Sequence, residues 1–291
     1  MSEHACLIDG TAYLFRGYYS VRPSHAADGT PVHAVIGLGN ALARVLRERD
    51  PSHVAVAFDA GRTNFRHRID ETYKANRGDP PEDLVPQFGL AQQLTEAMGL
   101  VTVSIPDYEA DDVLATLTTL ARGEGLDVVL VSGDKDLGQL LDDGVRLYDL
   151  AKGDEFGAAD VPGRMGVRAE QIVDLLALMG DSSDNIPGVR GVGPKAACAL
   201  LDHFDDLEAI YAGLDAVPSL PVRGAKSLRT KLEACREDAE RSRVLATVCR
   251  DVPLGLEVDD MRWEGADPDA LLEFTATWGL GRLADRVRWR E

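Results

Sequence analysis

Three short apolar runs, separated by segments of helical periodicity, constrain the fold of this chain more than any other feature. The runs cover residues 5–8, 54–58 and 128–131, and each has about the length of a buried strand. Between them, apolar residues recur at helical spacing in residues 32–47 and 111–124. Residues 100–105 and 145–148 indicate two further strands. Strands that alternate with helices predict an α/β fold with a central, mostly parallel sheet and flanking helices.

Beyond about residue 152 the strand pattern fades and helical periodicity takes over. The segments 172–179, 195–201, 228–235, 241–248 and 268–278 all carry it. We therefore predict a catalytic α/β domain over residues 1–165 and a helical region over residues 166–291. A polar excursion at 61–81 interrupts the first domain and has five basic residues against three acidic ones. Long polar excursions between core elements are usually functional or mobile.

Composition excludes several classes of protein. The hydrophobic fraction of 45% and the charged fraction of 27% are ordinary for a folded globular chain. No apolar run approaches the roughly 20 residues that span a bilayer, and the N-terminus lacks a secretory pattern. The four cysteines show no CxxC spacing. We therefore expect a cytoplasmic protein with reduced thiols and no membrane partner. The net charge of −18 argues against a general nucleic-acid coat.

Acidic residues stand where the predicted strands and helices begin or end. Asp9 and Asp59 close the first two apolar runs, and Asp134 and Asp136 follow the third. In an open parallel sheet, ligands bind outside the carboxyl ends of the strands, so we expect these acids at one edge. Two short motifs, Tyr-Glu-Ala-Asp-Asp and Gly-Asp-Ser-Ser-Asp, add five more acids: Glu109, Asp111, Asp112, Asp181 and Asp184.

Each acid alone has an ordinary explanation, because an acid in the first turn of a helix gains roughly 0.3–1 kcal/mol from the helix dipole. That explanation does not cover all of them. Two unit charges about 4 Å apart repel by roughly 4 kcal/mol at an effective dielectric of 20, so crowded carboxylates must take up protons or hold cations. Oxygen donors without His or Cys favour Mg²⁺ or Mn²⁺. Two such ions roughly 3.5–4 Å apart cleave phosphodiesters by activating water and stabilising the leaving oxygen.

Other phosphate chemistries fit the motifs less well. The Asp-Gly-Thr at 9–11 lacks the second acid of the aspartyl-phosphate phosphatases, and a receiver domain would end well before residue 291. The Gly-Leu-Gly at 37–39 lies in a helical pattern without a third glycine at the dinucleotide-binding spacing, so it indicates helix packing. The glycines at 188 and 193 have P-loop spacing, but no Ser or Thr follows the lysine at 195, which excludes a Walker motif.

A glycine-rich turn at 186–195 lies between two helical patterns. Gly191 and Gly193 permit positive φ and a close approach, and Lys195 adds a positive charge. Successive backbone N–H groups beside a helix N-terminus make a phosphate nest. The segment from about 171 to 204 resembles a helix–hairpin–helix, which holds one DNA strand by its backbone. An ordinary helix–helix turn with a capping glycine is the alternative.

These motifs together resemble the bacterial and phage 5′-nuclease family, which includes flap endonucleases and the 5′→3′ exonuclease domain of DNA polymerase I. The resemblance rests on Leu-Ile-Asp-Gly at 7–10, Phe-Asp-Ala at 58–60, Tyr-Glu-Ala-Asp-Asp at 108–112, Ser-Gly-Asp-Lys-Asp at 132–136, Gly-Asp-Ser-Ser-Asp-Asn-Ile-Pro-Gly-Val at 180–189 and Gly-Val-Gly-Pro-Lys at 191–195. It covers about residues 5–254. Ser132 departs from the family, whose members often have Thr there. No polymerase region follows, so we expect a stand-alone nuclease or the nuclease domain of a longer chain.

The resemblance implies a PIN-like fold with a helical arch, at about residues 61–85, over the active site. It implies two or more Mg²⁺ or Mn²⁺ ions held by nine acids in two groups. The first group comprises Asp9, Asp59, Glu109, Asp111, Asp112 and Asp134. The second comprises Asp136, Asp181 and Asp184, with Asp134 close to both. It also implies a K⁺ site at main-chain carbonyls near Pro187, Val189 and Val192.

The Tyr-Lys-Ala-Asn-Arg at 73–77 matches the arch motif of the family. The resemblance therefore makes Lys74, Arg77 and Asp134 catalytic, with both cations on the scissile phosphate. It assigns DNA contacts to the arch, the hairpin and a second basic run: Arg66, Tyr73, Lys74, Arg77, Gly191, Gly193, Lys195, Lys226 and Arg229. A solvated basic face is the alternative for both basic runs. The net negative charge does not prevent binding, because the Debye length at physiological salt is about 8 Å.

We therefore expect a Mg²⁺- or Mn²⁺-dependent, structure-specific 5′ nuclease that hydrolyses DNA phosphodiesters. Its expected partner is DNA with a 5′ flap or a 5′ end at a duplex junction, its expected state is a monomer, and its expected role is flap processing in replication or repair. Two alternatives stay open. A PIN-type ribonuclease shares the acid cluster but normally lacks the glycine hairpin, and a non-catalytic junction-binding protein would bind DNA without metal-dependent turnover.

Overall fold

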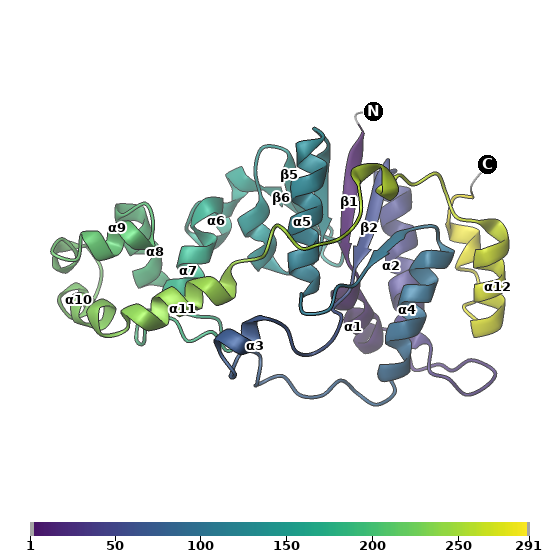
Figure 1. Ribbon diagram of the computed structural model, residues 1–291, viewed down its shortest axis with the longest axis horizontal. Helices are drawn as coiled ribbons and strands as arrows, with labels where there is room; N and C mark the ends of the chain where they lie inside the picture. Colours follow the sequence, from purple (N-terminus) through teal and green to yellow (C-terminus); the bar gives the residue numbers. More distant parts are fainter. Residues whose placement is uncertain (1–2, 290–291) are drawn as a thin grey trace.

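A twisted six-stranded sheet lies at the centre of the computed structural model, which describes residues 3–289 (Figure 1). The strands are β1 (His4–Asp9), β2 (His53–Ala57), β3 (Val101–Val103), β4 (Asp127–Val131), β5 (Val145–Asp149) and β6 (Asp154–Gly157). Their order is β3-β2-β1-β4-β5-β6; the first five are parallel and β6 pairs antiparallel with β5. The predicted α/β class and mostly parallel sheet are confirmed. The edge strand β6 escaped prediction because Asp-Glu-Phe-Gly has no apolar run.

Helices cover both faces of the sheet, and the alternation of side chains along the strands explains why. In β1, Cys6 and Ile8 face the core beneath α1 (Gly10–Ser20), α2 (His33–Arg49) and α4 (Val85–Ala97). Ala5 and Leu7 face the opposite core, which includes α5 (Ala110–Gly123). A parallel strand buried on both faces needs apolar residues at every position, which is the pattern that marked these strands in the sequence.

Helices α1 and α2 cross at glycines. A Cβ atom on Gly37 would lie 2.4 Å from the Cα atom of Gly17, so no other residue fits there without a shift of the backbone. On the same helix, a Cβ atom on Gly39 would meet the side chain of Leu283 at 2.6 Å. This confirms that the Gly-Leu-Gly motif at 37–39 serves helix packing.

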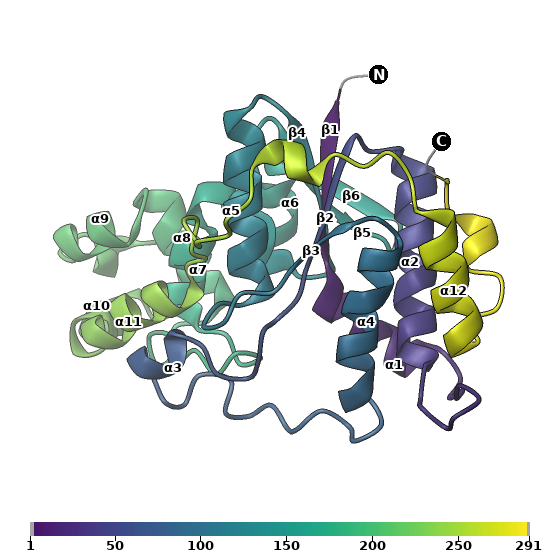
Figure 2. The ribbon, with the colours of Figure 1, turned by 45° about the vertical axis from the view of Figure 1, so that its right-hand side comes forward.

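A helical half lies at the opposite end of the molecule from α12 (Figures 1 and 2). It contains α6 (Val161–Met165), α7 (Ile172–Met179), α8 (Pro194–His203), α9 (Leu207–Ala212), α10 (Ala225–Ala234) and α11 (Arg236–Ala246). Helices α7 and α8 flank the glycine-rich turn in the predicted helix–hairpin–helix arrangement. No helix within residues 3–289 combines the length and the hydropathy that a membrane crossing requires.

The chain leaves the helical half after α11 and returns to the sheet, where α12 (Pro268–Trp278) packs near α2 and α4 (Figure 1). The N–H of Trp263 donates to the carbonyl of Ser52 at 2.9 Å, and Leu271 and Leu283 join the core of α2 and α4. The predicted helical region, 166–291, therefore does not stay together as one body at its C-terminal end. Helical periodicity predicted α12 but not the apolar face that it meets.

The polar excursion, which we call the strap (residues 61–84), contains one short helix, α3 (Arg66–Ile69). The rest of the strap consists of turns and extended chain that pass from β2 to α4 (Figure 2). The expected helical arch is thus helical only over four residues. Two consecutive prolines at 80 and 81 and the lack of apolar periodicity explain why a longer helix does not form.

Candidate active site

The carboxyl end of β1 places Asp9 at the edge of the sheet where the parallel strands end, and two hydrogen bonds fix its side chain. Asp9 is the N-cap of α1, and its Oδ1 accepts the N–H of Ala12 at 2.9 Å. Its Oδ2 accepts the hydroxyl of Ser132, at the end of β4, at 2.9 Å. The same hydroxyl accepts the N–H of Asp134 at 3.1 Å. A Ser or a Thr can make both bonds, so the departure at residue 132 preserves the contact.

The end of β2 connects this edge to the start of α5. Asp59 follows β2, and its Oδ1 accepts the N–H of Ala110 at 2.8 Å. This bond holds the first turn of α5 against the sheet, and that turn carries Glu109 and Asp111. Acids from β1, β2, β4 and α5 therefore meet at one place, as the parallel topology predicts.

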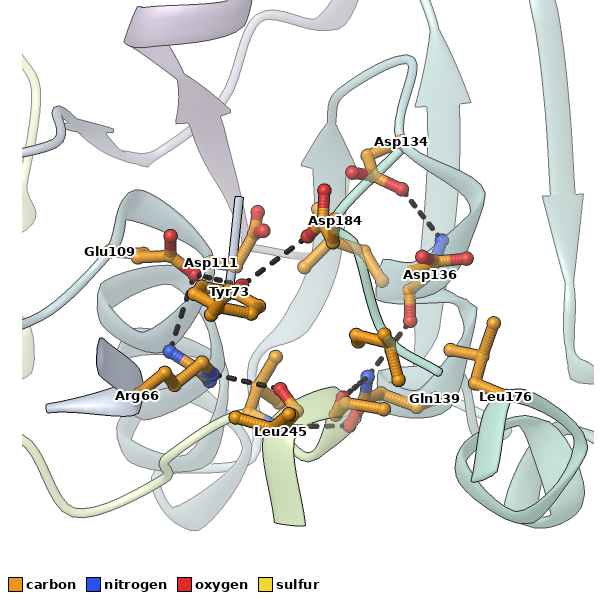
Figure 3. A pocket seen from close by; sticks show the side chains of 14 residues that line it. Arg66, Tyr73, Glu109, Asp111, Asp134, Asp136, Gln139, Leu176, Asp184 and Leu245 are labelled. Atoms are coloured by element: carbon orange, nitrogen blue, oxygen red, sulfur yellow. Dashed lines mark hydrogen bonds and ion pairs between the residues drawn. The ribbon is translucent and has the colours of Figure 1, made fainter. Parts of the chain in front are cut away.

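A pocket at this edge is lined by five of the nine predicted metal-binding acids (Figure 3). They come from α5, from the segment after β4 and from the loop between α7 and α8: Glu109, Asp111, Asp134, Asp136 and Asp184. The side chains of Tyr73 and Arg66 close one side of the pocket. Sequence positions more than a hundred residues apart are thus brought into one polar cavity.

The strap places two cations among these carboxylates. The Nζ of Lys74 lies 2.5 Å from Oε1 of Glu109 and 3.4 Å from Oδ2 of Asp184, and the guanidinium of Arg77 pairs with Asp184. The N–H of Lys74 donates to the carbonyl of Asp184 at 2.9 Å, and the amide of Asn76 donates to the carbonyl of Ser182 at 2.6 Å. The strap is therefore bonded directly to the loop that follows α7.

Burial, and after it the charges of neighbouring acids, raises the pKa values of several acids at this edge. Burial is the main cause for Asp9, whose pKa rises to about 7, and the charges of Asp59 and Asp134 add to it. The pKa of Asp136 also rises to about 7, through burial and then the charges of Asp134 and Asp181. The pKa of Asp111 lies well above its ordinary value for the same reasons. Without compensating cations, part of this cluster holds protons near neutral pH.

The donor set fits hard divalent cations. It consists of carboxylate oxygens, and Oδ1 of Asp136 is buried without a hydrogen-bond partner. No three Asp, Glu, His or Cys side chains among residues 3–289 already converge as a finished coordination shell. Lys74 and Arg77 pair instead with Glu109 and Asp184. Binding of an ion there requires these carboxylates to exchange an ammonium or guanidinium partner for the ion.

These pKa values predict that the metal-free protein loses stability as pH rises from about 4 to about 7. Asp9 and Asp136 have ordinary pKa values of 3.8 and folded values of about 7, so in this window the folded chain holds protons that the unfolded chain has released. Ionising both groups in the fold should lower the free energy of unfolding by roughly a few kcal/mol. Thermal melts in EDTA at about pH 5 and about pH 8 measure this, and Mn²⁺ should restore stability at the higher pH. A melting temperature that does not fall between the two pH values would contradict it.

Three predicted site residues face inward instead of toward DNA or an ion. Arg66 and Tyr73 are each only 2% exposed, so in this arrangement neither side chain presents a surface to DNA, and their predicted DNA contacts stay a prediction. The hydroxyl of Tyr73 donates to Oε2 of Glu109 at 2.9 Å, beneath the cluster. Asp112 is fully buried and pairs with Arg66. A motif fixes the position of a residue along the chain but not the side to which its side chain turns.

The hairpin between α7 and α8 confirms one of its two predicted glycine roles. Gly191 has φ of 81°, whereas Gly193 is extended and caps α8. The carbonyl of Gly191 accepts the Nζ of Lys231 at 2.9 Å. Gly193 and Lys195 are exposed at the start of α8, where backbone N–H groups point away from the helix. The K⁺ site at the hairpin carbonyls stays a prediction.

The second basic run on α10 is partly neutralised. The guanidinium of Arg229 lies 2.6 Å from Oδ1 of Asp215 and 2.8 Å from Oε1 of Glu233. Lys226 is exposed on the same helix. The charge available for DNA on this helix is therefore smaller than the sequence run suggests.

Sequence reasoning missed Gln139, which lines the pocket. Its Nε2 donates to the carbonyls of Asp136 and Ala246, each at 3.1 Å, and its Oε1 accepts the N–H of Val248 at 3.1 Å. Gln139 thus ties the segment after β4 to the chain after α11. A lone glutamine in a short 3₁₀ helix carries no pattern that would have marked it.

Comparisons with known proteins find family models and relatives that match most of this chain. Residues 4–166 match the family model described as "5′-3′ exonuclease, N-terminal resolvase-like domain", and residues 167–269 match "5′-3′ exonuclease, C-terminal SAM fold". DNA polymerase I of Rhizobium leguminosarum is 36% identical over 293 residues, which cover 98% of this chain but only 28% of that protein.

Solved structures share the fold. The 5′-exonuclease of phage T5 with bound zinc superposes with a TM-score of 0.71 at 24% identity, covering 97% of this chain and 100% of that one. A complex of the T5 flap endonuclease with DNA and metal ions gives a TM-score of 0.67 at 24% identity, covering 97% of this chain and 100% of that one.

Proposed function

This chain belongs to the 5′-3′ exonuclease family, and from that premise we propose that it is a metal-dependent nuclease that cleaves DNA at 5′ flaps and at 5′ ends beside a duplex junction. The ions proposed are Mg²⁺ or Mn²⁺, because every donor in the pocket is a hard oxygen. The proposed donors are Asp9, Asp59, Glu109, Asp111, Asp134, Asp136, Asp181 and Asp184.

The observation that carries the proposal is the pairing of two strap cations, Lys74 and Arg77, with Glu109 and Asp184, two carboxylates that line the pocket. Lys74 is only 16% exposed and lies within 3.4 Å of two carboxylates, although its own segment is polar and without a long helix. A cation buried among acids suits a site whose substrate is itself anionic. When a phosphate arrives, Lys74 and Arg77 can turn from carboxylate oxygens to phosphate oxygens with bonds of the same kind.

In this proposal the residues of the chain divide the work. Divalent ions bound among the carboxylates would neutralise phosphate charge and lower the pKa of water. Lys74 and Arg77 donate to the phosphate oxygens on which charge develops during cleavage. Ser132 and Ala12 hold Asp9 in place by hydrogen bonds at 2.9 Å.

The helix–hairpin–helix is the proposed grip on the duplex. Exposed Gly193 and Lys195 stand at the start of α8, where the free N–H groups of a helix favour a phosphate. Contacts of this kind recognise the backbone and the shape of DNA instead of its bases, so binding should weaken steeply with salt. Lys226 would contact the DNA backbone further along the same duplex. Arg229 would do so only if Asp215 and Glu233 release its guanidinium.

A 5′-labelled flap substrate tests the proposal. We expect cleavage near the flap junction with Mg²⁺ or Mn²⁺ and none with EDTA. Matched controls are the same duplex without a flap and a single-stranded RNA of the same sequence. Preferred cleavage of the RNA would indicate a ribonuclease instead, and junction binding without any metal-dependent product would indicate a non-catalytic DNA-binding protein.

A further inference from the structure

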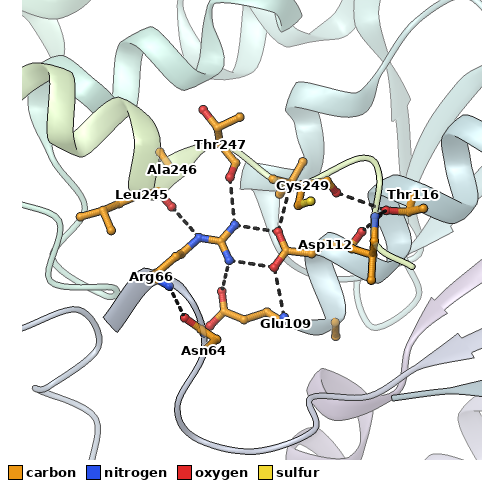
Figure 4. Close-up of polar contacts among 12 residues, drawn as sticks. Asn64, Arg66, Glu109, Asp112, Thr116, Leu245, Ala246, Thr247 and Cys249 are labelled. Carbon is orange, nitrogen blue, oxygen red and sulfur yellow. Dashed lines mark hydrogen bonds and ion pairs between the residues drawn. The ribbon is translucent and has the colours of Figure 1, made fainter. Parts of the chain in front are cut away.

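The guanidinium of Arg66 has every one of its donors satisfied inside the protein (Figure 4). Its Nε donates to the carbonyl of Leu245 at 2.9 Å. Its Nη1 donates to Oδ2 of Asp112 at 2.8 Å and to Oε2 of Glu109 at 3.3 Å. Its Nη2 donates to Oδ1 of Asp112 at 2.7 Å and to the carbonyl of Thr247 at 2.9 Å. An arginine side chain has five N–H donors, so none is left for a phosphate.

The carboxylate of Asp112 likewise has all of its acceptor positions occupied inside the protein. Its Oδ1 accepts Nη2 of Arg66 and the N–H of Cys249, the latter at 2.8 Å. Its Oδ2 accepts Nη1 of Arg66 and the N–H of Glu109, the latter at 3.1 Å. A carboxylate offers about four lone-pair positions, and all four are filled. Asp112 therefore has no oxygen lone pair with which to bind an ion in this arrangement.

The pair joins three segments that are distant in the sequence. Arg66 lies on α3 of the strap, Asp112 lies in the first turn of α5, and the carbonyls of Leu245 and Thr247 lie where α11 ends. Arg66 also contacts Glu109, which accepts bonds from Lys74 as well. The position of the strap cation thus depends on a buried contact eight residues earlier in the chain.

We propose that Arg66 and Asp112 are a positioning pair that docks the strap, and with it Lys74, onto the metal-binding edge, and that Asp112 is the counterion of Arg66 and not a metal ligand. The inference deepens the proposed nuclease function and rests on it. It differs from the prediction made from the sequence, which placed Asp112 among the metal ligands and Arg66 on DNA. Bidentate geometry and complete burial make the pair specific, since a lysine cannot supply the same five donors.

A mutant cycle with a matched control tests the pair. The variants are Arg66→Met, Asp112→Asn and their combination, compared with Asp134→Asn. The control cycle is Arg68→Met and Asp107→Asn, because Arg68 on the same helix α3 makes a bidentate but exposed pair with Asp107 at 2.7 and 2.6 Å. Three quantities are measured: Mn²⁺ stoichiometry by calorimetry, the single-turnover rate on a saturating flap substrate, and the melting temperature.

We expect Asp112→Asn to bind the same number of Mn²⁺ ions as the wild type, whereas Asp134→Asn loses one. Each single change at 66 or 112 should slow cleavage about 30-fold or more, because each leaves one buried charge without its partner. The double variant should cleave at least about tenfold faster than the two single losses multiplied together would predict, because it leaves neither charge buried without a partner. The control cycle should be additive. Loss of a Mn²⁺ site in Asp112→Asn, or an additive cycle at 66 and 112, would overturn the proposal.

Two further results keep the test decisive. If Arg66→Met does not fold, Arg66→Lys takes its place in the test. This variant should keep the Mn²⁺ stoichiometry of the wild type and cleave more slowly. Cleavage at the wild-type rate would overturn the proposal that Arg66 and Asp112 act as a pair. If the wild type fails to cleave any flap, the proposed function fails, but Mn²⁺ stoichiometry and the coupling in melting temperature still decide the role of Asp112.

Discussion

Asp134→Asn should lower the single-turnover cleavage rate by about a thousandfold or more, the largest effect we expect from any single change. The charge of Asp134 raises the pKa of Asp9 and Asp111 on one side of the pocket and of Asp136 on the other. It is thus the carboxylate shared by both groups of acids. Its removal should weaken the binding of every divalent ion proposed for this pocket, and such ions lower the energy of the developing charge by several kcal/mol.

The same substitution should leave the fold intact and make the metal-free protein more stable. Asn keeps the shape of the side chain and can still accept the N–H of Asp136, a bond of 2.8 Å. It removes one of the repelling charges, so the melting temperature in EDTA at about pH 8 should rise. Asp143→Asn, the same change at an exposed site, is the control for both measurements. Wild-type cleavage by Asp134→Asn would remove this residue from the metal site.

Lys74→Ala should slow single-turnover cleavage by roughly a hundredfold to a thousandfold while changing duplex affinity little. Loss of one well-placed donor to developing charge typically has an effect of that size. Lys74 is held in place by its backbone bond to Asp184 and has a left-handed φ of 53°, and its ammonium already lies beside the carboxylates of Glu109 and Asp184. The measurement is the rate at saturating flap DNA, with the dissociation constant of the uncleaved duplex determined in EDTA.

Arg68→Ala provides the control for Lys74, because Arg68 is also a strap cation but pairs with the exposed Asp107 away from the pocket. It should cleave at close to the wild-type rate. Equal losses in both variants would mean that the strap acts through its overall charge. A Lys74→Ala variant with an unchanged rate would remove Lys74 from the reaction.

The sequence was informative wherever one local pattern decides the structure. The apolar runs located β1, β2 and β4, and the helical periodicity gave α7 and α12 with the same bounds that the structure shows. The parallel topology then required Asp9, Asp59 and Asp134 to share an edge. Short elements with weak patterns, such as β6 and α9, could not be found this way.

The sequence was less informative about the direction in which a side chain points and about the residue with which it pairs. Nothing in the motif around Arg66 distinguishes a guanidinium that reaches for DNA from one that reaches the carbonyls of Leu245 and Thr247, 179 and 181 residues away. Gln139 and Ser132 act through a few hydrogen bonds that no periodicity records. Long-range polar contacts depend on tertiary packing, which one sequence does not encode in any local window.

The return of the chain to the sheet after α11 makes the helical half an insertion within the nuclease half. Both of its ends are connected by the chain to the same sheet, one through the segment after β6 and one through the segment that leads to Trp263. Two connections restrict rotation of the helices proposed to hold DNA far more than a single hinge would. Removing residues from the C-terminal side of the chain would therefore expose the core beside α2 and α4, because Leu271 and Leu283 cover it. The helices proposed to hold DNA would stay intact.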